Sequence, residues 1–366
     1  VQSFNFNFPS VIGSAVGVRS YLLYSMLLIL IPAAMEYIQR PERWVLFISL
    51  VVIVPVLILG IYQYNQPIDA WINQYVSEDQ SLAGVAGRPR IVGTFSYIQG
   101  MEAFSIFSLF FSMAVLFAGL TYKHRLYMWL GLVLLALSLV VAPMTGSRSV
   151  VFGALIPLPL VLYAVFSGRR GLVVAMGSVL ITLVGVYAIT ASPWASQGWD
   201  TLQQRIDGAN DRDTRIESML MDPVRKISVG GLIGYGTGAT HPGAGALAPG
   251  GRIDIPDVYY EGEPGRIIIE LGVLGGVLHT ILRLILAWIA WQALRRAVTP
   301  WETLLGILVF SKIFAGIPSL GVFNHVGGAI YWLCAGIAVW LWSKQTKRTG
   351  LRTPVKRDTS PRSLIH

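Results

Sequence analysis

Residues 44–62 read WVLFISLVVIVPVLILGIY, a run without a single charged side chain. A helix of this length rises about 28 Å at 1.5 Å per residue, close to the roughly 30 Å hydrocarbon core of a bilayer. Comparable apolar runs, this one included, fall at about 18–38, 42–62, 100–121, 125–146, 148–167, 171–192, 265–292, 300–317 and 325–343. The sequence therefore predicts an all-α, polytopic transmembrane bundle of about nine helices.

The composition also indicates a membrane protein. Hydrophobic residues make up 54% of the 366 residues and charged residues 13%, whereas soluble domains carry roughly 25% charged residues. Cys334 is the single cysteine, so the chain has neither a disulfide framework nor a cysteine-based metal site. Because the chain begins at Val1 and lacks a signal-peptide pattern, we expect the first helices of the natural protein to be missing from it.

Basic residues mark one side of the membrane. They cluster in four short connections and in the C-terminal tail: 39–43, 123–125, 168–170, 295–296 and 344–366. Since cytoplasmic connections are enriched in Lys and Arg, these segments are predicted to be cytoplasmic. The segments predicted to lie outside are then 63–99, 143–148 and 193–264. Residues 1–343 thus form one integral-membrane domain, 193–264 its large outer loop, and 344–366 a disordered basic tail.

The formal net charge of +9 raises the question of a nucleic-acid partner. The basic residues sit at the predicted inner membrane surface, where anionic lipid headgroups attract them. We therefore expect membrane lipid, and no nucleic acid, as the partner of this charge.

Several polar residues fall near the predicted outer ends of the spans: Glu102, Arg148, Glu270, Lys312, Asn324 and His325. Each alone has an ordinary explanation, a side chain that reaches the interface or an interhelical ion pair. Together, at one depth, they predict a water-filled cavity that opens outward. His279 and Arg283 are expected closer to the inner leaflet, on one face of their helix.

The outer loop contains a glycine run, GGLIGYGTG at 230–238, followed by His241. This run lets backbone approach a ligand closely. Further along, Glu263, Arg266 and Glu270 share one face of a predicted helix at positions i, i+3 and i+7, and Arg266 is the expected ion-pair partner of Glu263.

Four outer arginines are candidates for binding pyrophosphate: Arg90, Arg148, Arg215 and Arg266. The planar guanidinium binds phosphate oxygens in pairs and keeps its charge at any relevant pH. For any one of them, a lipid headgroup or a carboxylate is the ordinary partner.

Four local patterns occur in an informative order. They are RIVGTFS at 90–96, TGSRS at 145–149, Arg215 about twenty residues before GYGTG at 234–238, and EPGRIIIELGVLGG at 263–276. In this order the chain resembles the bacterial O-antigen ligase and O-antigen polymerase superfamily over roughly residues 85–345.

The resemblance implies a metal-independent glycosyltransferase without a cofactor. Its donor would be a glycan on undecaprenyl diphosphate at the outer face of the bacterial inner membrane, and its acceptor lipid A core or another carrier-linked glycan. The positions that match the diphosphate-binding arginines are Arg90, Arg148 and Arg215. His241 matches the loop histidine that serves as general base, although it stands earlier in the loop than in family ligases. Glu263 is the rival base, and Arg266 a further substrate-binding residue.

Two other classes compete with the enzyme. A transporter or flippase of lipid-linked glycan would show inverted repeats and helices broken near the midplane. The sequence shows no internal repeat, and its polar residues gather near one surface, which favours the enzyme. A sensor or a purely structural membrane protein leaves the long outer stretch unexplained.

Overall fold

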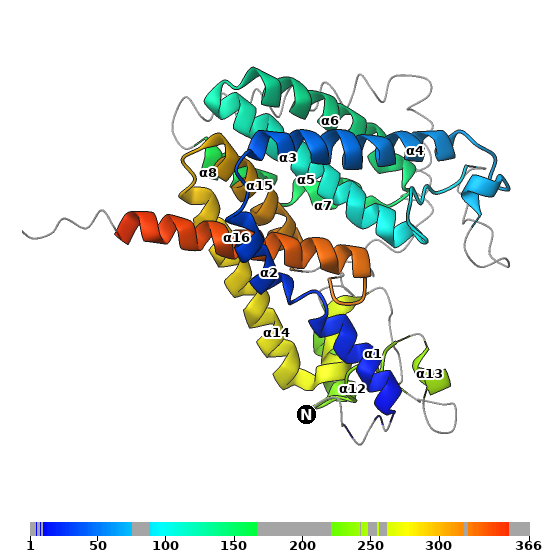
Figure 1. The fold of residues 1–366 in the computed structure, drawn as a ribbon. Coiled ribbons are helices and arrows are strands. Elements are labelled where there is room, and N and C mark those ends of the chain that lie inside the picture. The colour runs from blue at the N-terminus through cyan, green and yellow to red at the C-terminus, as the bar shows by residue number, and fades with distance from the viewer. Residues whose placement is uncertain are drawn as a thin grey trace, which may run out of the picture.

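The computed structural model describes Asn5, Phe8, Ile255 and six longer segments: 10–74, 88–166, 221–241, 243–247, 262–317 and 321–350. The regular elements of these residues are helices (Figure 1). Six helical stretches are long and apolar enough to cross a membrane: Val11–Met35, Pro41–Tyr64, Ile98–Tyr122, Arg125–Met144, Glu263–Arg295 and His325–Arg348. The all-helical membrane class is therefore confirmed, whereas the predicted number of nine spans is not.

Four predicted spans are long apolar stretches of helix. The run at 42–62 forms α3 (Pro41–Phe47), a π-helical segment (Ile48–Ile53) and α4 (Val54–Tyr64) without interruption. Pro55 explains the π segment, because its missing N–H breaks the regular hydrogen-bond ladder of the preceding turn. The other three spans are α5 (Ile98–Tyr122), α6 (Arg125–Met144) and α16 (His325–Gly350).

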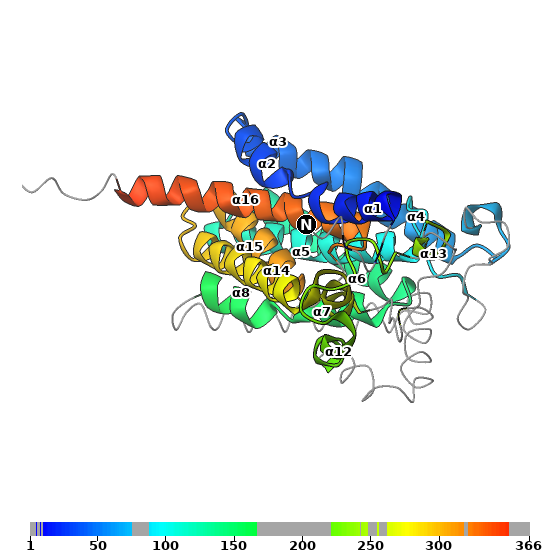
Figure 2. The ribbon, with the colours of Figure 1, turned by 90° about the horizontal axis from the view of Figure 1, so that it is seen from below.

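The predicted span 18–38 begins earlier and is divided. α1 (Val11–Leu22) and α2 (Leu27–Met35) are joined by a stretch of i→i+3 hydrogen bonds, such as Leu27 N to Tyr24 O at 3.0 Å. α2 lies along α16, whereas α1 contacts α13 (Ala244–Leu247) and accepts a hydrogen bond from Thr237 Oγ1 at Ser14 O (Figures 1 and 2). α12 (Ile227–Gly230) packs instead against the helix Glu263–Arg295. The division lets one apolar run contact two different parts of the molecule.

Two predicted spans are not among these six stretches. The run 148–167 is two helices of 8 residues, α7 (Arg148–Leu155) and α8 (Leu158–Val165), which meet at Ile156 and Pro157. Each rises only about 12 Å, so neither crosses a bilayer alone. α15 (Pro300–Ala315) has 16 residues, about 24 Å, and begins with Thr299, whose side chain accepts from Glu302 N. The predicted span 171–192, most of the outer loop and residues 351–366 lie outside the described residues.

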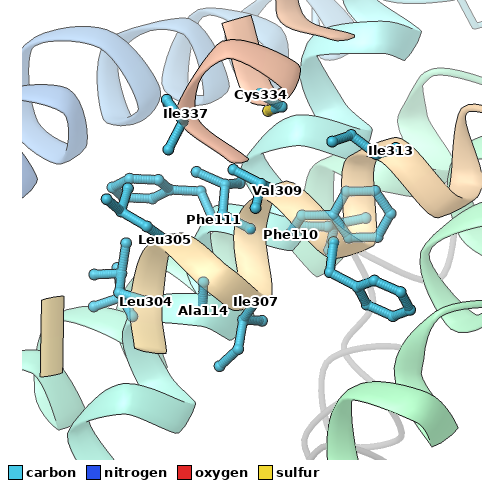
Figure 3. Packing of buried hydrophobic residues seen from close by; sticks show 14 of the residues in the cluster. Phe110, Phe111, Ala114, Leu304, Leu305, Ile307, Val309, Ile313, Cys334 and Ile337 are labelled. Atoms are coloured by element: carbon cyan, nitrogen blue, oxygen red, sulfur yellow. The ribbon is translucent and has the colours of Figure 1, made fainter. Parts of the chain in front are cut away.

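The core lies where α5, α15 and α16 meet (Figure 3). Phe110, Phe111 and Ala114 of α5 pack with side chains of α15 and α16 that include Ile307, Val309, Cys334 and Ile337. By contrast, many apolar side chains of α3, α4 and α14 (Glu263–Arg295) are exposed. An apolar exterior on long apolar helices is what a surrounding bilayer requires.

The structure gathers the basic connections at one end of the bundle. His124 lies 3.8 Å from Glu42, and Tyr122 Oη lies 3.2 Å from Thr303 Oγ1. Arg348 donates to Glu302 and to Arg296 O, both at 3.3 Å. We call residues 36–43, 122–125, 295–303 and 340–348 the basic end. Their common position is the one predicted for 39–43, 123–125, 295–296 and the start of the tail, while the side of the membrane stays a prediction.

Candidate active site at the break in α14

α14 is interrupted at Gly272. Its φ is +69° and its ψ −178°, a conformation that is almost exclusive to glycine. A Cβ there would lie 2.5 Å from Ile233 N. The interruption comes nine residues after the helix begins and divides α14 into a short first part and a long second part.

The glycine run satisfies the backbone groups that the interruption exposes. Tyr235 N donates to Ile269 O at 2.8 Å, Gly236 N to Glu270 O at 2.9 Å, and Val273 N to Gly231 O at 3.0 Å. Buried backbone groups that lose helical partners need such replacements, above all inside a membrane protein. The run at 230–238 and the break in α14 therefore form one unit.

Glu270 holds the turn that follows the glycine run. Its buried carboxylate accepts from Gly238 N at 3.1 Å, from Thr240 N at 3.0 Å and from Thr240 Oγ1 at 2.6 Å. Arg266 binds the same turn from one helical turn away, with Nε 3.1 Å from Thr240 Oγ1 and Nη2 2.9 Å from Thr240 O. The predicted ladder of Arg266 and Glu270 thus converges on Thr240, the residue directly before His241.

Phe323 supports the guanidinium of Arg266, which stacks over the phenyl ring at 3.7 Å from its centroid. Such stacking fixes the plane of the guanidinium. The short segment that contains Phe323 also carries Asn324 and His325, at the beginning of α16.

Glu263 pairs with Arg283, whereas we expected Arg266 as its partner. The two side chains form an ion pair although 20 residues separate them in the sequence. In a straight helix they would be about 30 Å apart, so only the break at Gly272 lets them meet. Arg283 was predicted to lie apart from these residues, closer to the inner leaflet. The structure instead places it in direct contact with Glu263.

The remaining hydrogen bonds of this pair fix the loop before α16. Glu263 accepts from Gly321 N at 2.6 Å, Val322 N at 2.7 Å and Phe323 N at 3.3 Å. Arg283 Nη1 donates to Gly316 O and Ile317 O, both at 3.0 Å. With four hydrogen bonds the carboxylate of Glu263 uses about all the lone pairs it has. Its geometry favours a structural role over that of a base.

His241 is partly buried, and its Nδ1 accepts from Gly243 N at 3.0 Å. Burial lowers the pKa of His241 below its ordinary 6.5, and the nearby Arg266 and His325 lower it further. The imidazole is therefore neutral at pH 7. Because Nδ1 accepts a hydrogen bond, the neutral ring carries its proton on Nε2 in this conformation.

Arg90 belongs to a second group of residues. It pairs with Glu102 at 3.0 Å and donates from Nε to Thr145 O at 3.0 Å. Gly146, at a φ of +64°, leaves room for it, since a Cβ there would lie 3.1 Å from Arg90 Nε. The structure thus brings Arg90 against the turn that leads into α7. Arg148 begins that helix, its side chain lies outside the described residues, and so does Arg215 altogether.

Segment 323–325 links the two groups. Asn324 Nδ2 donates to Gln99 O at 3.1 Å, one turn before Glu102. On the other side, Phe323 lies under Arg266, and His325 is close enough to influence His241. Lys312 is apart from both groups, buried beside Cys334 in the core. The polar residues predicted to share one cavity therefore form two groups joined by this segment.

Sequence reasoning missed Arg283, Thr240 and Phe323. Gly272 in an otherwise helical pattern is only a weak signal for them, because a single glycine inside a helix does not reveal a break. In the described part of the chain, no group of three or more His, Cys, Asp or Glu side chains could hold a metal ion. Comparisons with known protein families, with curated proteins and with solved structures found no match for this chain.

Proposed function

We propose that this protein is a membrane glycosyltransferase that takes a glycan from an undecaprenyl-diphosphate carrier at the outer face of the bacterial inner membrane. It either passes the glycan to an acceptor such as lipid A core or polymerises it onto another carrier-linked glycan. The observation that carries the proposal is the Thr240–His241 turn. Arg266 and Glu270 hold this turn in place, so that a neutral imidazole stands beside a fixed guanidinium.

The reaction requires correctly positioned and charged side chains more than a cofactor. An acceptor hydroxyl oxygen attacks the anomeric carbon, the bond from that carbon to the diphosphate oxygen breaks, and the diphosphate leaves with the electron pair. Preorganised arginines stabilise the negative charge that develops on the diphosphate. We assign this role to Arg90, Arg148, Arg215 and Arg266.

The hydroxyl proton goes to His241, which is neutral and therefore able to accept it. For this, the ring has to release Gly243 N, because Nδ1 accepts that hydrogen bond and Nε2 holds the proton. Glu263, the rival base, is already bound by Arg283 and three backbone N–H groups. We therefore favour His241 as the base and Glu263 as the residue that shapes the site.

The experiment uses the purified full chain with a carrier-linked glycan and an acceptor, without a nucleotide. The expected result is a new glycosidic bond and release of the carrier diphosphate. His241→Ala should lower turnover at least about a hundredfold and retain carrier binding. Arg266→Lys should lower turnover by a similar factor, because a point charge does not reproduce the guanidinium fork. Arg348→Lys, the same change at the basic end, serves as the control and should leave turnover unchanged. Normal turnover in His241→Ala would remove the base assignment.

The break at Gly272 favours a second candidate, a transporter or flippase of lipid-linked glycan, since interrupted helices are typical of transporters. The same purified protein in vesicles distinguishes the two functions. A transporter moves the intact carrier-linked glycan between leaflets and forms no new linkage. Translocation without any change in glycan length or attachment would replace the enzyme with this alternative.

A further inference from the structure

An open cavity of about 720 Å³ lies between α2 and α16. Its polar lining residues are Glu36, Trp340, Ser343, Lys344, Lys347 and Arg348. The volume falls in the range of ordinary ligand sites, about 300–1,000 Å³. The cavity is at the basic end, away from the residues that contact Thr240 and His241, so the proposed reaction makes no use of it.

The walls of the cavity give it a positive charge. Three cationic side chains face one carboxylate, Glu36, and that carboxylate accepts from Trp340 Nε1 at 2.9 Å. Lys344 lies over the same indole ring, with Nζ 4.9 Å from the centroid. Arg348 is bound to Glu302, which leaves Lys344 and Lys347 as the cationic residues best placed to attract an anion.

The surroundings of the cavity are apolar on one side. Pro32 of α2 lines the cavity, and Ile29, three residues earlier on the same helical face, is 78% exposed. Leu30 is exposed next to it. A free phosphate or a soluble anion gains nothing from such a surface, whereas the acyl chains of a lipid cover it. A tryptophan beside lysines at the end of a spanning helix is also typical of the headgroup region.

We propose that this cavity binds the phosphate headgroup of an anionic phospholipid of the cytoplasmic leaflet. Lys344, Lys347 and Ser343 contact the phosphate, Trp340 and Glu36 form the floor, and the acyl chains follow α2 past Ile29. Pockets of basic residues between membrane helices on the cytoplasmic side recognise anionic lipids in this way. This proposal does not depend on the glycosyltransferase function, so an experiment that disproves one of the two leaves the other standing.

Native mass spectrometry of the full-length protein tests the site, with phosphatidylglycerol and phosphatidylcholine of identical acyl chains as probes. We expect phosphatidylglycerol to bind in preference to phosphatidylcholine. The double variant Lys344→Gln, Lys347→Gln should weaken phosphatidylglycerol binding at least about tenfold, because each lysine near an anionic surface contributes appreciably. The double variant Lys344→Arg, Lys347→Arg keeps the charges and should retain binding. It also shows that substitution at these positions leaves the protein folded.

The matched control removes two positive charges elsewhere at the basic end. Lys123 and Arg125 are exposed there, and Asn tolerates the φ of +55° at position 123. Lys123→Asn with Arg125→Gln should leave binding unchanged. An equal loss in this control would show diffuse attraction and overturn the site. Equal binding of both lipids would also overturn it, as would displacement of phosphatidylglycerol by millimolar inorganic phosphate, which would identify a free-anion site.

Discussion

The two ends of the bundle handle charge in opposite ways. At the basic end, Arg348 reaches Glu302 at 3.3 Å with its own side chain 35% exposed. At the end that carries the candidate site, Arg283 and Glu263 are 6% and 0% exposed, and backbone N–H and C=O groups complete their hydrogen bonding. Glu302 is itself buried, with its side chain 4% exposed, so water reaches only the Arg348 side of that pair. Removing one partner costs less where water reaches the pair than where both partners are buried. The charges at the basic end are predicted to orient the chain, whereas those at the other end hold a shape.

The first prediction concerns the opposite location of the two ends. In a Cys334→Ala background, Leu232→Cys should react completely with a membrane-impermeant maleimide in intact cells, because Leu232 lies within the glycine run and is 70% exposed. Arg43→Cys, at the basic end, should react only after the membrane is permeabilised. Labelling of both positions from the same side would eliminate the topology and the proposed location of the active site.

The second prediction compares the two ion pairs. Arg283→Gln leaves the buried Glu263 carboxylate without its cation and should lower the free energy of unfolding by about 3–5 kcal/mol. Arg348→Gln, the matched change at the basic end, should cost less than Arg283→Gln, because water reaches the Arg348 side of that pair. Unfolding of the purified proteins in detergent, followed by tryptophan fluorescence, measures both.

The double variant Glu263→Gln, Arg283→Gln sharpens this comparison. Because it removes the unpaired charge, it should be more stable than Arg283→Gln alone. If the single Arg283 and Arg348 variants lose the same stability, the contrast between the two ends is wrong.

The third prediction concerns the break in α14. Gly272→Ala should destabilise the protein by about 3 kcal/mol, because the new methyl group meets both a positive φ and the backbone of Ile233. Gly231 has a φ of +59° but nothing within 4 Å of a built Cβ. Gly231→Ala, at a ψ of −156°, therefore isolates the conformational cost, which should be the smaller of the two losses. The same unfolding assay applies, and equal losses would mean that the close approach of the two backbones is not tight.

The elements that the sequence predicted well are those decided by local composition. The helix at 98–122 matches its predicted bounds closely, because hydropathy and length alone determine it. The helix that begins at His325 was also predicted, but it continues to Gly350, past the predicted end at 343 and into the segment predicted as a disordered tail. The N-cap at Thr299 was also recognisable, since a capping residue acts on its own helix.

The contacts that the sequence did not predict depend on the break in α14, which brings distant residues together. Nothing near Glu263 indicates that Arg283 will be its partner, because the contact exists only once the helix is broken at Gly272. The pattern IIIELGVLGGVL at 267–278 looks continuously helical, and glycine alone does not reveal a break. For the same reason, the residues that surround Thr240 were predicted as candidates but not as one group. The chemistry of the site was readable in its residue types, whereas its geometry was not.

The last and smallest effect concerns the protonation of His241. Its folded-state pKa lies below 6.5, first through burial and then through Arg266 and His325. The unfolded chain therefore binds the proton more readily, so His241 contributes stability above pH 6.5 that is lost as the pH falls from 6.5 through the lower folded value.

If His241 is the base, kcat/KM should fall on the acid side with a midpoint below 6.5, in the same pH window as the loss of stability. If His241 instead donates a hydrogen bond from Nε2, protonation leaves that donor in place and the acid limb is absent. Arg266→Gln removes one cause of the lowered pKa and should move the midpoint toward 6.5. A rate that stays flat from pH 7 down to the pH at which the unmodified protein unfolds would rule out His241 as the base while leaving its contact with the turn intact.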